Sequence, residues 1–451
     1  MTKTVKIKKG LDIKLKGKSR KDIGDIAVKS GDLYAIKPID FAGVIPKLLV
    51  KEEESVKKGT PLFYSKSNPE IVFCSPVSGS VKAVVRGEKR LLLEVVIEAD
   101  GAQESVDLEN IGDAMKKEEF KNLLLKYGFW PAIRQRPFNI IAHPEDSPKA
   151  IFISGFDSAP LAPDFEYVFK NRIELIQKAI DSIAMLTDGK VYLSLHKKHN
   201  GENSIFKTLK NVEINYFEGP HPSGNIGTQI HHLDPINIGE TAWFISLFDL
   251  LNIGRLLEEK KLSYDKVITL SGAEFKDPKY YNACSGVSLW SIEQFENAQS
   301  VRTISGNVLS GRQISDKGFL GFYDYSFTAI PEGDYYEFMG WIMPGFKKFS
   351  VSRTFFSWLT PKREYNLDTN MHGELRNFVV TGQYEKVFPW DIMPQQLIKA
   401  MMVRDYDMMQ NLGILEVAEE DFALCEVICT SKNELQDIVR NSITDYIKEM
   451  V

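Results

Sequence analysis

The segment with the most evident capacity for chemistry is residues 219–235. It carries His221, His231 and His232 among three glycines and three prolines. An imidazole can donate or accept a hydrogen bond near neutral pH, so these side chains could contact a polar ligand. A long Gly- and Pro-rich loop is often a binding loop in an α/β fold, but it can equally be a rigid connector. The residues leave both interpretations open.

A second candidate segment, residues 128–138, combines aromatic rings with guanidinium groups. It contains Trp130, Arg134, Arg136 and Phe138. Such residues can stack on a planar ligand or pair with an anion. They can also pack a domain junction, with the arginines at its rim.

The cysteines do not indicate metal chemistry. The chain has four, and two of them, Cys425 and Cys429, are spaced to lie one helical turn apart. Structural metal sites usually need four ligands, and no histidine is close to this pair in the sequence. We expect two packed thiols and no metal site.

Composition restricts the class of protein. The chain has 451 residues and a net charge of −5, from 56 Lys and Arg against 61 Asp and Glu. An acidic chain is a poor match to nucleic acid, which requires a basic surface. The N-terminus does not resemble a signal peptide, and no window approaches the roughly 18 apolar residues of a membrane span. We therefore expect a soluble, cytoplasmic protein without a transmembrane segment.

The sequence predicts an α+β fold of four domains. Residues 1–105 alternate in the manner of short strands, and residues 56–62 and 75–81 resemble the half-motifs of a biotinyl/lipoyl-like barrel-sandwich hybrid. The lysine-rich start of this domain could face anionic lipid or an acidic partner, or be a solvated strand edge.

Residues 106–260 predict a degenerate Rossmann-like α/β domain. Apolar strands at 150–153, 190–195 and 212–217 alternate with helical segments, which indicates a parallel sheet. Residues 241–257 are apolar at helical spacing and predict a helix. No Gly-x-Gly-x-x-Gly motif follows any strand, so we expect no nucleotide bound in the usual way.

The remaining sequence predicts two further domains. Residues 261–365 are rich in strands and resemble a β-grasp domain of the soluble-ligand-binding (SLBB) type. Residues 366–451 show helical patterns, the first at 375–380, and predict a small helical bundle.

The order of these domains, together with a set of short motifs, resembles one known family. That family is NqrA, the A-type subunit of the bacterial Na⁺-translocating NADH:quinone oxidoreductase, and the likeness extends over the full chain. The motifs lie at residues 7–12, 75–79 with 86–87, 130–138, 219–224 with 227–231, 388–394 and 420–429.

The resemblance implies a peripheral subunit with no complete active site of its own. In this family NADH oxidation and covalent flavins reside on other subunits, and the NqrA chain docks on the membrane subunit NqrB at the cytoplasmic face of the inner membrane. Related flavoproteins carry a glycine-rich flavin loop and cysteine-rich cluster sites, which this chain lacks. We expect no flavin, iron–sulfur cluster or metal, and no catalytic residue.

The leading hypothesis is a subunit that helps to form the quinone-binding end of the complex. Stacking and positive charge would come from the 128–138 segment, and a histidine would donate a hydrogen bond to a quinone oxygen. The candidate residues are Trp130, Arg134, Arg136, Phe138, His221 and His231. The alternative is a structural or docking subunit without a ligand site. An independent flavin enzyme is disfavoured because the glycine loop is missing.

Overall fold

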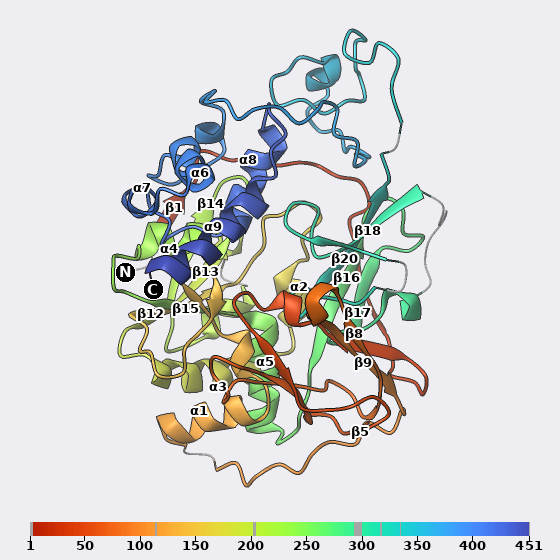
Figure 1. Cartoon of the computed structure of the whole chain (residues 1–451), viewed down its shortest axis with the longest axis vertical. Helices are drawn as coiled ribbons and strands as arrows, with labels where there is room; N and C mark the ends of the chain where they lie inside the picture. Colours follow the sequence, from red (N-terminus) through yellow and green to blue (C-terminus); the bar gives the residue numbers. More distant parts are fainter. Residues whose placement is uncertain are drawn as a thin grey trace.

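The protein is described by a computed structural model that covers residues 3–112, 115–201, 204–292, 300–315, 318–333 and 335–450. Two larger and two smaller β-sheets form within these residues (Figure 1). Residues 4–99 contain strands and short 3-10 turns, which confirms the all-β prediction for the first part of the chain.

A seven-stranded sheet forms the centre of the α/β region. Its parallel part is confirmed, because β12, β13 and β14 pair in parallel, as do β12 with β15 and β1 with β14. Two antiparallel strands, β10 and β11, extend it. In sheet order the strands are β1 (Thr4–Lys6), β14 (Glu213–Glu218), β13 (Lys190–His196), β12 (Ala150–Ser154), β15 (Ala242–Ser246), β10 (Arg134–Arg136) and β11 (Ile140–Ile141).

Helices cover both faces of this sheet because alternate side chains of each strand point to opposite sides. Ile151 and Ile153 of β12 share a core with α3 (Ile173–Ile183) and α5 (Leu247–Glu258). Phe152 faces the other way and packs with α4 (Ile226–Leu233). Two further helices, α1 (Lys117–Lys126) and α2 (Phe165–Phe169), complete the region.

Three local predictions are wrong. The 219–235 segment is not a loop throughout, since α4 occupies Ile226–Leu233. The predicted helix 241–257 begins with the strand β15 and becomes helical at Leu247, because a fully buried strand and a buried helix share one apolar pattern. Residues 375–380 have no regular structure.

The other sheets adjoin this one. Two small sheets, β3-β9-β8-β5 and β4-β6-β7, lie within residues 33–99, and a six-stranded sheet has the order β19-β18-β20-β16-β17-β2, with β16 parallel to β20. The bounds are β2 (Arg20–Asp25), β3 (Leu33–Ile36), β4 (Pro46–Leu48), β5 (Ser55–Val56), β6 (Pro61–Ser65), β7 (Val72–Cys74), β8 (Gly79–Arg86), β9 (Leu92–Ala99), β16 (Asp265–Ser271), β17 (Lys279–Cys284), β18 (Val301–Ser305), β19 (Arg312–Ile314) and β20 (Ser326–Pro331).

The first 25 residues are distributed between sheets. The strand β1 joins the seven-stranded sheet, and β2 pairs with β17 of the six-stranded sheet. Sequence patterning within one segment cannot reveal such long-range pairing. The four predicted domain boundaries stay a prediction.

Helices dominate the C-terminal part, shown in blue in Figure 1. They are α6 (Pro394–Val403), α7 (Tyr406–Asn411), α8 (Ala423–Ile428) and α9 (Leu435–Met450), and they share an apolar core of their own. Among the described residues, no helix is both long enough and apolar enough to span a bilayer.

Candidate functional site: a cavity where three regions meet

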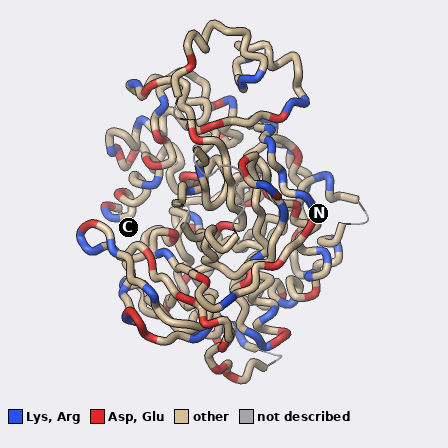
Figure 2. Tube along the Cα trace, turned by 90° about the vertical axis from the view of Figure 1, so that its right-hand side faces the viewer, with Lys and Arg blue, Asp and Glu red and all other residues tan. Residues whose placement is uncertain are grey.

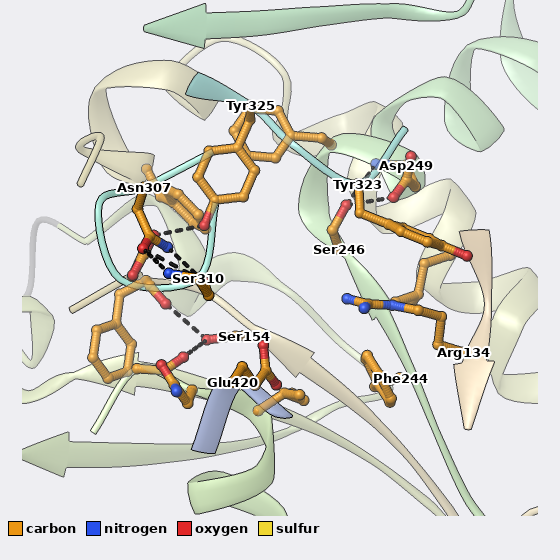
Figure 3. A pocket seen from close by; sticks show the side chains of 18 of the residues that line it. Arg134, Ser154, Phe244, Ser246, Asp249, Asn307, Ser310, Tyr323, Tyr325 and Glu420 are labelled. Carbon is orange, nitrogen blue, oxygen red and sulfur yellow. Dashed lines mark hydrogen bonds between the residues drawn. The ribbon is translucent and has the colours of Figure 1, made fainter. Parts of the chain in front are cut away.

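A cavity of about 150 Å³ lies at the carboxyl end of the parallel sheet (Figure 3). Ser154 ends β12 and Ser246 ends β15, the two are neighbours in the sheet register, and both line the cavity. The chain leaves β12 toward β13 on one side and returns to β15 on the other. Such a switch point opens a crevice at the strand ends, where open α/β sheets bind ligands.

The six-stranded sheet region supplies the opposite wall. Tyr323 and Tyr325, just before β20, line the cavity together with Asn307, Leu309 and Ser310. The Tyr325 hydroxyl donates to Asp157 Oδ2 at 2.6 Å, and burial raises the pKa of this phenol well above its usual value. Tyr325 therefore stays protonated, with its proton directed at Asp157.

Arg134 projects into the cavity from β10 (Figure 3). Its guanidinium carbon lies 4.2 Å from the ring centre of Tyr323 and 4.6 Å from that of Phe244. Its polar contact is a long one, 3.4 Å from Nη1 to Asn139 Oδ1. Within the described residues Arg134 forms no ion pair, so two aromatic faces hold a cation with unused N–H donors.

The acidic groups around the cavity already have partners. Asp249 accepts from the Ser246 hydroxyl at 2.6 Å, while Glu420 pairs with Arg136 at 3.0 Å. Asp157 accepts from Tyr325, as described above. Glu420 and Asp249 have cationic partners, Arg136 and Lys266, whereas Arg134 and Asp157 line the cavity without an ion pair to any described residue.

His221 lines the same cavity and is buried. The Ser158 hydroxyl accepts from the Gly224 N–H at 2.8 Å and lies 3.0 Å from His221 Nδ1. A Ser158 hydroxyl that donates its proton to Nδ1 would leave the imidazole proton on Nε2. Burial lowers the pKa of His221 to about 4, so the ring is neutral at pH 7. In that tautomer Nε2–H could donate to a ligand.

Gly224 permits this close approach. A Cβ atom at this position would lie 2.5 Å from the Ser158 nitrogen and 2.8 Å from its Oγ. Gly224 therefore allows its backbone to pack directly against Ser158 in the cavity wall.

Two of the aromatic candidates lie away from the cavity. Trp130 is fully buried, donates from Nε1 to the Ala142 carbonyl at 2.8 Å, and meets Trp243 edge to face. Phe138 belongs to the apolar core of the C-terminal helices, where its ring faces Tyr446.

Arg136 and His231 hold the C-terminal helices to the α/β sheet. Arg136 is 1 % exposed and forms ion pairs with Glu420 at 3.0 Å and Asp421 at 3.2 Å. His231 Nδ1 lies 2.7 Å from Glu416, and its ring stacks on Trp390. The structure thus brings Arg134 and His221 together at one cavity and places the other four candidates in interior or inter-region contacts.

A larger groove of about 830 Å³ adjoins the cavity. Arg134, Leu309, Ser310 and Tyr323 line both spaces. The groove continues between residues 38–44 and the C-terminal helices. Its further lining combines apolar side chains (Ile39, Leu91, Ile140 and Ile141) with charged ones (Asp40, Arg302, Arg312, Glu419, Glu426, Glu434, Asp437 and Arg440). A ligand in the cavity could extend into this groove.

Comparison with known proteins places this architecture in a family. Models of three NqrA regions match the chain: the N-terminal barrel-sandwich hybrid domain over residues 5–100, the second alpha/beta domain over 115–262 and the C-terminal domain over 267–316. The A-type subunit of the Na(+)-translocating NADH-quinone reductase of Rhodopirellula baltica is 36% identical, covering 98% of both chains. The corresponding subunit of Yersinia pestis is 35% identical, covering 99% of this chain and 100% of the relative.

The chain belongs to the NqrA family. The predicted family is confirmed, and the barrel-sandwich and α/β domains of the sequence analysis correspond to named NqrA domains. The residues of the cavity described above are therefore those of an NqrA-family chain.

Several cavity residues of this NqrA chain were missed by the sequence analysis. Ser154 and Ser246 could have been found from the ends of adjacent parallel strands, had β15 been recognised. Tyr325 and Glu420 carry no local signal, since they are more than 150 residues from Ser154 in sequence. All four cysteines are buried thiols, and the described residues contain no group of three or more His, Cys, Asp or Glu placed to hold a metal.

Proposed function

We propose that this chain is the peripheral NqrA subunit of a Na⁺-translocating NADH-quinone reductase, and that its central cavity holds the quinone head group. The complex would couple NADH oxidation and quinone reduction to Na⁺ export. The chain would dock on the membrane subunit NqrB at the cytoplasmic face of the bacterial inner membrane, with the remaining subunits as further partners.

The size of the cavity suits a single substituted ring. Its volume of about 150 Å³ is similar to the roughly 150 Å³ that admits benzene in an engineered protein core. Sites for larger, drug-sized ligands usually occupy about 300–1,000 Å³. The cavity alone therefore favours a quinone head group over a flavin nucleotide.

The Arg134 guanidinium, held between two aromatic rings with unused N–H donors, is the observation that carries the proposal. A quinone presents two carbonyl oxygens, which accept hydrogen bonds and gain negative charge on reduction. The guanidinium N–H groups and the neutral His221 Nε2–H can donate to such oxygens. A fixed positive charge within a cavity stabilises the charge that develops there.

The adjoining groove would accept the isoprenoid chain of the quinone. It shares Arg134, Leu309 and Tyr323 with the cavity and leads outward past Ile39 and Leu91. Apolar side chains along this path would offset part of the cost of holding an isoprenoid chain outside the bilayer.

The same proposal assigns no flavin, iron–sulfur cluster or metal to this chain. The missing glycine-rich loop and the burial of all four free thiols support that assignment. An absorption spectrum and metal analysis of the purified chain would test it.

Calorimetric titration of the purified chain with a short-chain quinone tests the head-group site. We expect saturable binding that Arg134→Leu weakens about tenfold or more, since loss of a hydrogen bond to a charged donor costs about 1.5–3 kcal/mol. Arg20→Leu removes a cation from the exposed edge strand β2 and should leave the affinity unchanged. Equal affinities of wild type and Arg134→Leu would contradict the proposal.

A structural or docking subunit without a ligand site is the second candidate function. The observation that favours it is the use of Arg136, His231 and Phe138 in contacts between regions. Absence of saturable quinone binding by the isolated chain, with normal assembly into the complex, would select this alternative.

A further inference from the structure

One segment of the chain differs from the rest in both charge and exposure. Residues 338–363, here called the aromatic-basic segment, contain five Lys or Arg and no Asp or Glu, although the whole chain has a net charge of −5. Figure 1 shows this part of the chain projecting at the top of the molecule, and Figure 2 shows Lys and Arg positions along it.

Large apolar side chains in this segment lie open to solvent. Soluble proteins rarely expose apolar groups in such a concentration unless the surface binds something. Those at least 46 % exposed are Phe338, Met339, Trp341, Ile342, Met343, Phe346, Val351, Phe356, Trp358 and Leu359.

Hydrogen bonds and a ring contact hold the aromatic-basic segment in a defined loop. At its base the Tyr335 hydroxyl donates to Asp368 at 2.7 Å, and Asn370 Nδ2 donates to the Tyr335 carbonyl at 2.6 Å. At its tip the Phe356 N–H donates to the Pro344 carbonyl at 2.9 Å, and the Phe346 and Phe356 rings meet edge to face. The apolar groups are therefore presented on a closed loop.

Its exposed cations have no internal partners. Lys348 pairs with Glu337, but Lys347, Arg353 and Lys362 are exposed and form no ion pair with any described residue. Their charge is available to an external anion.

The lysine-rich N-terminus adds further positive charge at the same place. The Lys14 carbonyl accepts from the Tyr365 N–H at 2.8 Å, and the Lys16 N–H donates to the Tyr365 carbonyl at 2.9 Å. The Lys14 ammonium also reaches the Pro361 carbonyl at 2.9 Å. Two regions separated by about 350 residues thus combine their lysines beside the aromatic side chains.

We propose that the aromatic-basic segment binds directly to the surface of an anionic lipid bilayer. Trp side chains favour the level of the lipid headgroups, and Lys and Arg are attracted to anionic lipids. Within residues 338–363, exposed Trp341 and Trp358 stand beside three unpaired cations, and the carboxylates Glu337 and Glu364 lie only at the two ends. This combination matches an anionic bilayer surface better than a protein surface of mixed charge. This contact would be additional to docking on a membrane subunit, and independent of any quinone site.

Co-flotation of the full-length purified chain with lipid vesicles tests the proposal. We expect binding to vesicles of phosphatidylcholine mixed with phosphatidylglycerol, weaker binding to phosphatidylcholine alone, and loss of binding at high salt. The triple variant Lys347→Glu, Arg353→Glu, Lys362→Glu should bind at least about 100-fold more weakly, since each cation contributes about 1 kcal/mol near such a surface.

A matched variant controls for net charge. Lys29→Glu, Lys51→Glu, Lys66→Glu changes three exposed lysines of the barrel-sandwich region by the same charge and should bind like wild type. Equal losses in both triple variants, or no binding to anionic vesicles, would overturn the proposal. Binding only to membranes that contain the partner subunits would also overturn it, and would assign the segment to a protein contact.

Tryptophan fluorescence locates the contact. Trp341 and Trp358 are exposed in the segment, and Trp290 is exposed elsewhere. Brominated anionic lipids should quench the chain and its Trp290→Phe variant equally, and should quench a Trp341→Phe, Trp358→Phe variant far less. Quenching that depends on Trp290 alone would contradict the assignment.

Discussion

The central cavity and the aromatic-basic segment are built in opposite ways. The cavity draws Arg134, Ser246, Tyr325 and Glu420 from strands, loops and helices far apart in the chain. The aromatic-basic segment takes nearly all its chemistry from one continuous stretch. Its side chains are exposed, whereas the polar groups around the cavity are mostly buried and paired.

This difference separates two ways in which a sequence encodes binding. The aromatic and basic residues of the segment follow one another in the sequence, so their proximity does not depend on how the core packs. The cavity exists only when three regions pack together, so it depends on contacts that bind no ligand. Substitutions around the cavity should therefore lower the free energy of unfolding much more than substitutions in the aromatic-basic segment.

We expect the largest loss of unfolding free energy when the buried ion pairs of Arg136, next to the cavity, are removed. Arg136→Leu would leave the buried Asp421 carboxylate and the Glu420 carboxylate without their cation. Removing one partner of a buried ion pair costs about 3–5 kcal/mol of unfolding free energy. Chemical denaturation should show this loss, whereas Arg134→Leu, two residues away on the same strand, should lose less than about 2 kcal/mol. Equal losses of unfolding free energy in Arg136→Leu and Arg134→Leu would contradict the view that Arg136 stabilises the fold and Arg134 does not.

The next effect is a pH dependence that belongs to the cavity. His221 has a folded pKa of about 4, below its usual 6.5, so its contribution to stability is complete above pH 6.5 and is lost as the pH falls toward 4. The loss should reach about 3 kcal/mol. Unfolding free energies of wild type and His221→Asn across this window should converge at low pH. Parallel pH profiles of the two proteins would contradict a buried, neutral imidazole.

The smallest effect is expected in the aromatic-basic segment. Trp341 is 77 % exposed, so Trp341→Ala should change the unfolding free energy by no more than about 0.5 kcal/mol. Thermal unfolding of this variant and of the buried counterpart Trp130→Ala provides the comparison. A large loss in Trp341→Ala would show that the segment belongs to the folded core.

Sequence patterns were most informative where a property is local. The strands at 150–153 and 190–195 and the β-rich first hundred residues follow from alternation and apolar runs, and the structure confirms them. The pattern failed at 241–257, where burial on both faces hides the difference between β15 and the start of α5. It also could not show that β1 and β2 pair with distant sheets.

The candidate site was predictable only in part. The chemistry of Arg134 and His221 predicts a role in ligand binding, and the structure places both side chains at the cavity. Trp130 and Arg136 have the same chemical character but point into packed interiors, where Trp130 meets Trp243 and Arg136 pairs with Glu420 and Asp421. A periodicity of two along β10 places Arg134 and Arg136 on one face, and only the tertiary contacts decide which of them meets solvent-filled space.

The most direct test of the central claim is a crystal structure of the protein with a bromine-substituted short-chain quinone. We expect an anomalous bromine peak in the cavity between Tyr323 and His221, with a quinone oxygen within hydrogen-bonding distance of the Arg134 guanidinium. A fully occupied peak elsewhere on the chain, with the cavity unchanged, would contradict it.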